Sequence, residues 1–171
     1  MRQWSMLFGA LSLAAGTAVA AAFGQDGRHL STAAFVHEVA RSQMYEVRAA
    51  KFAQSRAAST AVVQFAAEII KAHDKSAADL KDALSQAGLS ALAPEGLDVT
   101  REGLLGDLRA SGGDEFDRRY IGQQITAQQA TLHLAETYAS SGDSPALRWV
   151  ASEMVSQLSQ TLGRARELPS P

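Results

Sequence analysis

Cysteine is absent from this chain of 171 residues. Disulfide bonds, thiolate metal ligands and cysteine nucleophiles are therefore excluded, and stability must come from packing. A large excess of charge of one sign is also missing, because 16 Lys and Arg face 18 Asp and Glu, for a net charge of −2. The sequence thus carries no electrostatic signature of binding to nucleic acid or to an anionic membrane. It also lacks a Gly-rich phosphate loop, a Ser-His-Asp order and a zinc-protease helix motif.

Residues 1–22 have the layout of a secretory signal peptide. Arg2 precedes an apolar stretch rich in Ala and Leu, and the small residues at its end predict cleavage after Ala20 or Ala22. The alternative is an uncleaved N-terminal membrane anchor, but Gly, Ser and Thr interrupt the stretch, which falls short of the ~20 strongly apolar residues that span a bilayer. We therefore expect a periplasmic or otherwise exported protein, with a polar lead-in at residues 23–30 and no membrane span after cleavage.

The rest of the chain has the composition and periodicity of one helical domain. Hydrophobic residues make up 46% of the chain and charged residues 20%, which suits a soluble domain with an ordinary core. Apolar residues recur at spacings of three and four, without an alternating β pattern. The fold class we expect is all-α, a four-helix bundle over residues 31–168 with a short extra helix in the crossover. The expected helices cover about 31–57, 59–87, 101–110, 114–140 and 144–168, and the crossover covers 89–113.

Each predicted helix boundary has a residue that explains it. The hydroxyls of Ser31 and Thr32 can cap the first helix, and Gly88 can adopt the left-handed conformation that closes the second. Asp114 can cap the third long helix. Pro145 suits the first turn of the fourth, where its missing N–H loses no hydrogen bond. Short connections make the first and second long helices, and the third and fourth, antiparallel neighbours.

Each long helix has one polar residue in register with its apolar stripe: Glu46, His73, Gln128 and Thr161. One interpretation is a metal-binding or proton-handling layer inside the bundle. The other is a satisfied polar network, in which His73 pairs with Glu46 while the amide and the hydroxyl complete the hydrogen bonds. A lone core histidine is more often structural than a ligand, so we favour the network.

A second pair of polar residues, His133 and Glu136, has a spacing that can hold a metal ion. The order is the reverse of the Glu-x-x-His motif of di-iron helices, so we expect this pair on the surface. The weak metal candidates are then Glu46, His73, His133 and Glu136. We predict no cofactor, with iron, manganese or zinc as the alternative.

Several short motifs point to a known family. They are Phe35-Val36, Met44-Tyr45-Glu46-Val47, His73, Phe116-Asp117-Arg118-Arg119-Tyr120 and the restart at Asp143–Leu147. Together they resemble the exported bacterial, ferritin-like family known as domain of unknown function 4142, over roughly residues 33–166. The resemblance implies a ferritin-like bundle in the periplasm or outer envelope, and it implies no established activity.

The chain departs from that family at the inner polar positions. Where typical members carry further acids and histidines, this sequence has Arg48, Lys71, Gln128 and Thr161. A ferritin-type pair of ions needs about four Glu and two His, so most of that set is missing. We therefore expect a non-enzymatic envelope protein, stress-related or binding. The alternatives are a ferritin-like metalloprotein or oxidoreductase, and a protein-interaction module that presents a helix face or the crossover at 89–113 to an envelope partner.

Overall fold

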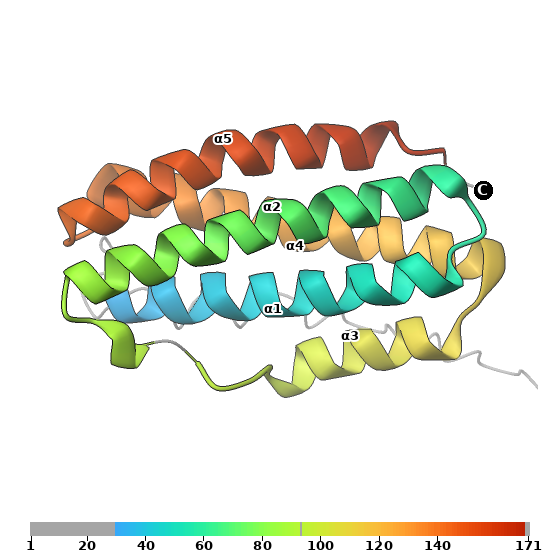
Figure 1. The fold of residues 1–171 in the computed structure, drawn as a ribbon, viewed down its shortest axis with the longest axis horizontal. Helices are drawn as coiled ribbons and strands as arrows, with labels where there is room; N and C mark the ends of the chain where they lie inside the picture. Colours follow the sequence, from blue (N-terminus) through green and yellow to red (C-terminus); the bar gives the residue numbers. More distant parts are fainter. Residues whose placement is uncertain (1–29, 93, 170–171) are drawn as a thin grey trace, which may run out of the picture.

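A computed structural model describes residues 30–92 and 94–169 of the chain (Figure 1). The predicted signal peptide and the lead-in up to residue 29 lie outside these residues. Inside them, the secondary structure is helical and contains no β-strand, which confirms the all-α class. No helix of this part combines the length and the apolar character needed to cross a bilayer. The elements are α1 (Thr32–Arg56), α2 (Thr60–Gln86), the 3-10 turn η2 (Ser90–Leu92), α3 (Val99–Ala110), α4 (Gly113–Ser141) and α5 (Pro145–Glu167).

The four long helices lie side by side, and α3 runs along α1 (Figure 1). α1 packs against α2 and α4, while α5 packs against α4 and α2, so each long helix has two long neighbours. The connections at 57–59 and 142–144 are short, which makes α1 and α2, and α4 and α5, antiparallel pairs. The longer connection between α2 and α4 carries η2 and α3.

Local capping explains where the first two helices begin and end. Ser31 accepts the backbone N–H of Ala34 at 3.2 Å, so the predicted cap of α1 is confirmed. Gly88 has a φ of +69°, and the N–H of Leu89 donates to the carbonyl of Leu84 at 2.8 Å. This arrangement closes α2 at the predicted glycine.

The start of α2 is capped from another helix. The Ser59 side chain makes no capping hydrogen bond; instead, the carboxylate of Asp117 on α4 accepts the backbone N–H of Ala58 at 3.1 Å and of Ser59 at 2.8 Å. The prediction that Asp114 caps α4 was wrong, because α4 begins directly after Gly112. Asp114 lies exposed in the first turn, where its charge still favours the helix dipole. The buried Asp117 therefore ties α4 to the turn between α1 and α2.

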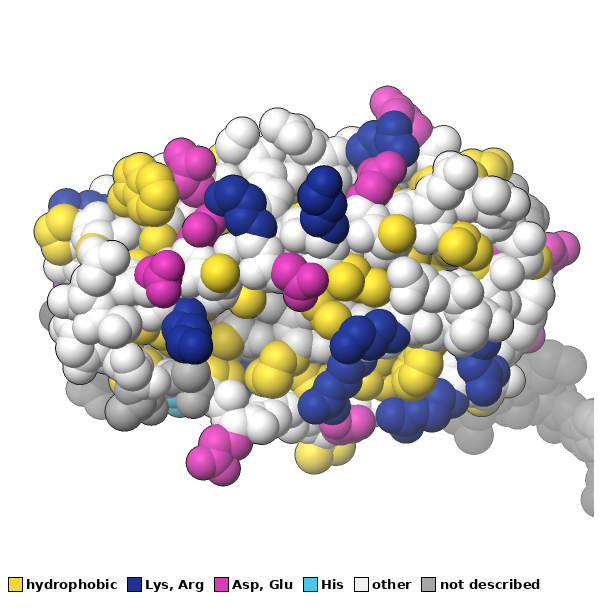
Figure 2. All heavy atoms as spheres, viewed as in Figure 1, with side chains coloured by type: hydrophobic (Ala, Val, Ile, Leu, Met, Phe, Trp, Pro, Cys, Tyr) yellow, Lys and Arg dark blue, Asp and Glu magenta, His cyan; other side chains and the backbone are white. Residues whose placement is uncertain are grey.

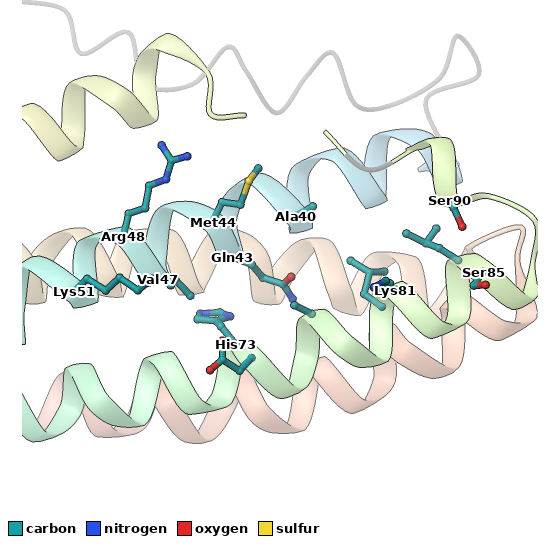
Figure 3. Close-up of a pocket in the computed structure, with 14 residues that line it drawn as sticks. Ala40, Gln43, Met44, Val47, Arg48, Lys51, His73, Lys81, Ser85 and Ser90 are labelled. Atoms are coloured by element: carbon teal, nitrogen blue, oxygen red, sulfur yellow. The ribbon is translucent and has the colours of Figure 1, made fainter. Parts of the chain in front are cut away.

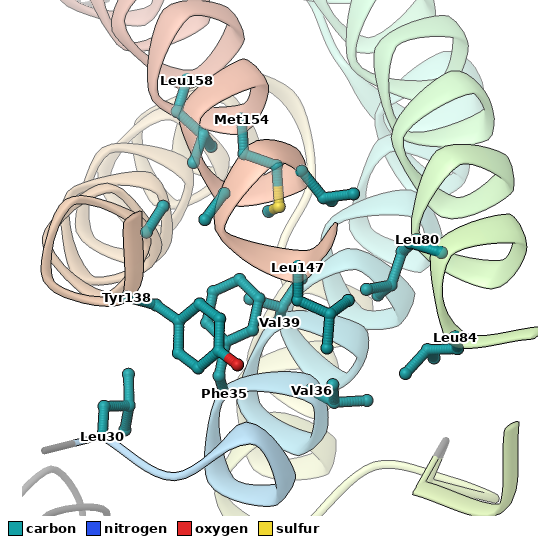
Figure 4. Close-up of a cluster of buried hydrophobic side chains, with 14 residues drawn as sticks. Leu30, Phe35, Val36, Val39, Leu80, Leu84, Tyr138, Leu147, Met154 and Leu158 are labelled. Atoms are coloured by element: carbon teal, nitrogen blue, oxygen red, sulfur yellow. The ribbon is translucent and has the colours of Figure 1, made fainter. Parts of the chain in front are cut away.

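Buried hydrophobic side chains form two clusters, one toward each end of the long helices. In the first cluster, the rings of Phe35 and Tyr138 stack with their centroids 4.1 Å apart (Figure 4). Leu30, which we expected as the last residue of the polar lead-in, is buried in this cluster. The second cluster includes Phe65 and Phe116 and takes in side chains of α3. The middle of the molecule, between the two clusters, is polar.

Candidate functional site

A band of buried polar side chains, the polar layer, separates the two hydrophobic clusters. It is contributed by α1, α2 and α4 and lies where the apolar stripes of these helices are interrupted. Its members are Ser42, Gln43, Glu46, His73, Ser76, Gln124, Gln128 and Thr131.

Glu46 and His73 form the centre of the polar layer. Their exposed fractions are 0% and 4%, and His73 Nε2 lies 2.9 Å from Glu46 Oε2. The Ser42 hydroxyl donates to Glu46 Oε1 at 2.9 Å and lies 2.8 Å from the hydroxyl of Thr131. Both carboxylate oxygens therefore have partners. Because a carboxylate only accepts hydrogen bonds, Nε2 is the ring nitrogen that carries the proton in this pair.

The α4 side of the layer leaves hydrogen-bonding capacity unused. Gln128 donates to Gln124 Oε1 at 3.3 Å. Four buried atoms in or next to the layer have no hydrogen-bond partner among the described residues: Gln124 Nε2, Gln128 Oε1 and the neighbouring Tyr120 OH on α4, and His73 Nδ1 on α2. Burial, together with the negative charge of Glu46, raises the pKa of Tyr120 well above its ordinary value. The layer is therefore a partly satisfied network, and each unpaired atom lowers stability.

The structure brings three of the four predicted inner residues into the interior. Glu46, His73 and Gln128 are buried, whereas Thr161 is half-buried. The Thr161 hydroxyl donates to carbonyls of its own helix, at 3.2 Å from Gln157 and 3.3 Å from Leu158. The buried stripe of α5 passes through Leu158 and its neighbours one turn apart, and Thr161 lies beside that stripe.

The metal candidates do not converge. His133 and Glu136 are exposed on α4, away from the Glu46–His73 pair. In residues 30–92 and 94–169, no group of three or more His, Asp or Glu side chains is placed to hold an ion. A ferritin-type centre requires Glu and His from all four helices, and both oxygens of Glu46 are already hydrogen-bonded. The residues present therefore do not fit such a centre.

A groove runs between α1 and α2 on the outer side of the polar layer, with a volume of about 610 Å³ (Figure 3). We call it the α1–α2 groove. Its lining is mainly apolar and includes Ala40, Met44 and Val47 of α1 and Ala77, Leu80 and Leu84 of α2. His73 and Gln43 also line the groove and connect it to the polar layer, where Gln43 donates to Ser76 at 2.7 Å.

The edge of the α1–α2 groove is cationic. Arg48, Lys51 and Lys81 line it, and among the described residues Asp74 is the one carboxylate that faces them. The Arg48 guanidinium points toward α3, where it lies 3.0 Å from Glu102 (Figure 3). On the same face, Figure 2 shows hydrophobic side chains between α1 and α2, with Lys and Arg as well as Asp and Glu side chains around them. The groove thus combines an apolar floor with a positive edge.

Sequence reasoning did not find this groove. Apolar residues recur along α2 at spacings of three and four, and Ala77 is one of them, but the structure exposes Ala77 and buries Ser76 instead. A periodic pattern shows which residues are apolar, but it does not show which of them a third helix will cover. One sequence feature could have indicated the groove: the apolar positions of α2 spread over a wide face of the helix.

Within the part of the chain that the structure describes, the large hydrophobic side chains exposed elsewhere on the surface do not form a second site. Val99 at the start of α3 is 90% exposed and Trp149 on α5 is 61% exposed. These helices lie on opposite sides of the molecule (Figure 1). Singly exposed hydrophobic residues are normal on protein surfaces, so neither residue marks an interaction surface by itself.

Comparison with known proteins gives one result that bears on identity. The sequence matches a family model described as "Domain of unknown function (DUF4142)" over residues 17–168. Neither the curated proteins nor the solved structures provide a match. The matched range contains all the helices described above, and it confirms the family that the short motifs indicated. The chain therefore belongs to the DUF4142 family.

Proposed function

We propose that this chain is an exported, non-enzymatic binding protein of the cell envelope, and that the α1–α2 groove holds its ligand. The observation that carries the proposal is the groove itself. Its volume of about 610 Å³ falls within the roughly 300–1,000 Å³ of small-molecule sites, and its lining is mainly apolar with a few polar groups, as in such sites.

The placement of the acid–base groups supports binding rather than catalysis. A general acid or base must reach the proton that it transfers. Glu46 is fully buried, and its two carboxylate oxygens accept from Ser42 and His73. Among the residues that line the groove, none is both a nucleophile and hydrogen-bonded to a base. We infer that the groove retains its ligand unchanged.

The connectivity supports a ferritin-like four-helix bundle as the architecture. Two antiparallel pairs, α1 with α2 and α4 with α5, are joined by the long connection that carries α3. Bundles of the ferritin-like type have one such long crossover. In our proposal this scaffold has no metal function and positions the walls of the groove.

Export rests on the N-terminal sequence. The apolar stretch after Arg2 ends in small residues, so we propose signal cleavage after Ala20 or Ala22. The intact mass of protein recovered from a periplasmic fraction tests this, and we expect a chain that begins at Ala21 or Phe23. A species that still begins at Met1 and fractionates with membranes would show an anchor instead.

Binding in the groove can be tested with the neutral apolar dye N-phenyl-1-naphthylamine and the mature protein. We expect saturable fluorescence from one site. Ala77→Phe places an aromatic ring in the groove and should weaken binding by about tenfold or more, a change of roughly 1.4 kcal/mol. Ala78→Phe is the matched control, because Ala78 is exposed on the same helix outside the groove.

Two results would contradict the proposal. One is the absence of saturable binding to the natural protein. The other is equal binding by Ala77→Phe and Ala78→Phe while both variants unfold at the temperature of the natural protein.

A further inference from the structure

We propose that the ligand of the α1–α2 groove is an elongated anionic amphiphile, with an alkyl chain on the apolar floor and an acidic head group at the cationic edge. This inference rests on the proposed function and adds the chemical class of the ligand.

The shape of the groove favours a chain over a compact ring system. On α1 the lining runs from Ala40 to Lys51, and on the antiparallel α2 it runs from Ser85 to His73. At a rise of about 1.5 Å per residue, the α1 stretch is roughly 16 Å long. A volume of about 610 Å³ spread over this length gives a trough that a single extended alkyl chain can follow.

The floor is suited to an alkyl chain because its side chains are aliphatic. Met44, Val47, Leu80 and Leu84 line it, together with two alanines. Apolar contact stabilises binding by roughly 25 cal/mol for each Å² of apolar surface removed from water. Met44 is unbranched and flexible, so it can adapt to a chain of variable position.

The charge of the edge selects the head group. Lys51 and Lys81 are exposed and have no ion-pair partner among the described residues, and Asp74 is the one carboxylate of the described residues that lines the groove. Arg48 is paired with Glu102, so we assign the selection to the two lysines. Lys51 on α1 and Lys81 on α2 lie toward opposite ends of the groove (Figure 3), so an acidic head group at either end would meet one ammonium, whereas a cationic head group would be repelled.

The experiment is displacement of N-phenyl-1-naphthylamine from the mature protein by three amphiphiles of equal chain length. They are dodecanoate, dodecanol and dodecyltrimethylammonium, each kept below its aggregation concentration. We expect dodecanoate to compete about tenfold more strongly than dodecanol, and dodecyltrimethylammonium to compete least. The double variant Lys51→Met/Lys81→Met should remove the advantage of dodecanoate and leave dodecanol unchanged.

A control with the same change in charge separates local from general electrostatics. Lys71→Met/Lys75→Met removes two exposed lysines of α2 that do not line the groove. It should keep the preference for dodecanoate. Loss of the preference in this control would overturn the assignment to the edge lysines.

The remaining outcomes separate this inference from the proposed function. Equal competition by all three amphiphiles would overturn the anionic class while a binding groove stands. Failure of the dye and of every amphiphile to bind would overturn both. A dimer in light scattering that dissociates in Ala77→Phe would identify the groove as a contact between copies of this chain, and would also overturn both.

Discussion

The carboxylate of Asp117 on α4 accepts the backbone N–H of Ser59 at 2.8 Å, at the start of α2. The same carboxylate accepts the N–H of Ala58, so one side chain satisfies two amides of the turn between α1 and α2. Helix starts leave such amides without partners inside the helix. The position of α4 relative to the α1–α2 pair is therefore fixed by hydrogen bonds as well as by apolar packing.

We expect Asp117→Ala to lower the free energy of unfolding by about 1–3 kcal/mol, the range for leaving buried polar groups unpaired. Asp117→Asn should cost less, because its amide oxygen can still accept one of the two N–H groups. Urea unfolding measures both. Asp114→Ala is the control for a first-turn aspartate that is exposed. Equal losses of unfolding free energy in all three variants would show that the hydrogen bonds of Asp117 to the N–H groups of Ala58 and Ser59 do not contribute to stability.

The Glu46–His73 pair should behave as a coupled unit in a double-mutant cycle. His73→Leu leaves a buried carboxylate without one of its partners, so we expect a loss of about 3–5 kcal/mol. Glu46→Leu/His73→Leu should recover much of that loss, because two apolar side chains of similar size then pack together. Thermal or urea unfolding of the single and double variants measures the coupling. Losses that simply add would show that the two side chains do not interact.

The three tyrosines should make stability fall at high pH. Burial raises the pKa of Tyr45, Tyr120 and Tyr138 above the ordinary value of 10.0, and the charge of Glu46 raises it further for the first two. Above pH 10 the unfolded chain therefore loses phenolic protons that the folded chain keeps, so the free energy of unfolding decreases as pH rises. The stabilisation that comes from keeping the three phenols protonated is fully present below pH 10.

Absorbance at 295 nm, recorded together with circular dichroism, checks the tyrosine prediction. We expect phenolate to form mainly when the helical signal is lost. Titration of three phenols at their ordinary pKa while the helices stay intact would contradict it.

Metal analysis tests our proposal that the bundle has no ferritin-type metal function. The mature protein should retain less than one equivalent of metal after incubation with iron, manganese or zinc and desalting, because the exposed His133 and Glu136 do not join the Glu46–His73 pair and both oxygens of Glu46 are hydrogen-bonded. Elemental analysis of protein purified without an affinity tag measures this. One equivalent that is lost on His73→Ala would restore the metalloprotein alternative.

Local sequence signals were sufficient to predict the helices and the pairing of Glu46 with His73. Gly88 marks the end of α2 because only a residue that tolerates a positive φ suits that position. The sequence also predicts that Glu46 and His73 meet, since antiparallel helices joined by a short turn bring these positions level, and the two side chains lie 2.9 Å apart.

Features that depend on tertiary contact were missed or misplaced. Nothing in the sequence near Asp117 indicates that it caps a different helix. Thr161 has the right helical spacing, but the packing of α5 places it beside the buried stripe. The α1–α2 groove exists because no third helix of the described residues covers Ala77 and its neighbours, and a helical periodicity contains no information about such coverage.

Methyl carbon-13 NMR of methionine tests the binding groove most directly. Of the four methionines, two lie in the predicted signal peptide, which leaves Met44, which lines the groove, and Met154, which is buried in the first hydrophobic cluster. Met44→Leu assigns the two signals. We predict that dodecanoate shifts the Met44 signal in a saturable manner and leaves the Met154 signal in place. A Met44 signal that does not move, or a shift confined to Met154, would contradict a ligand in the α1–α2 groove.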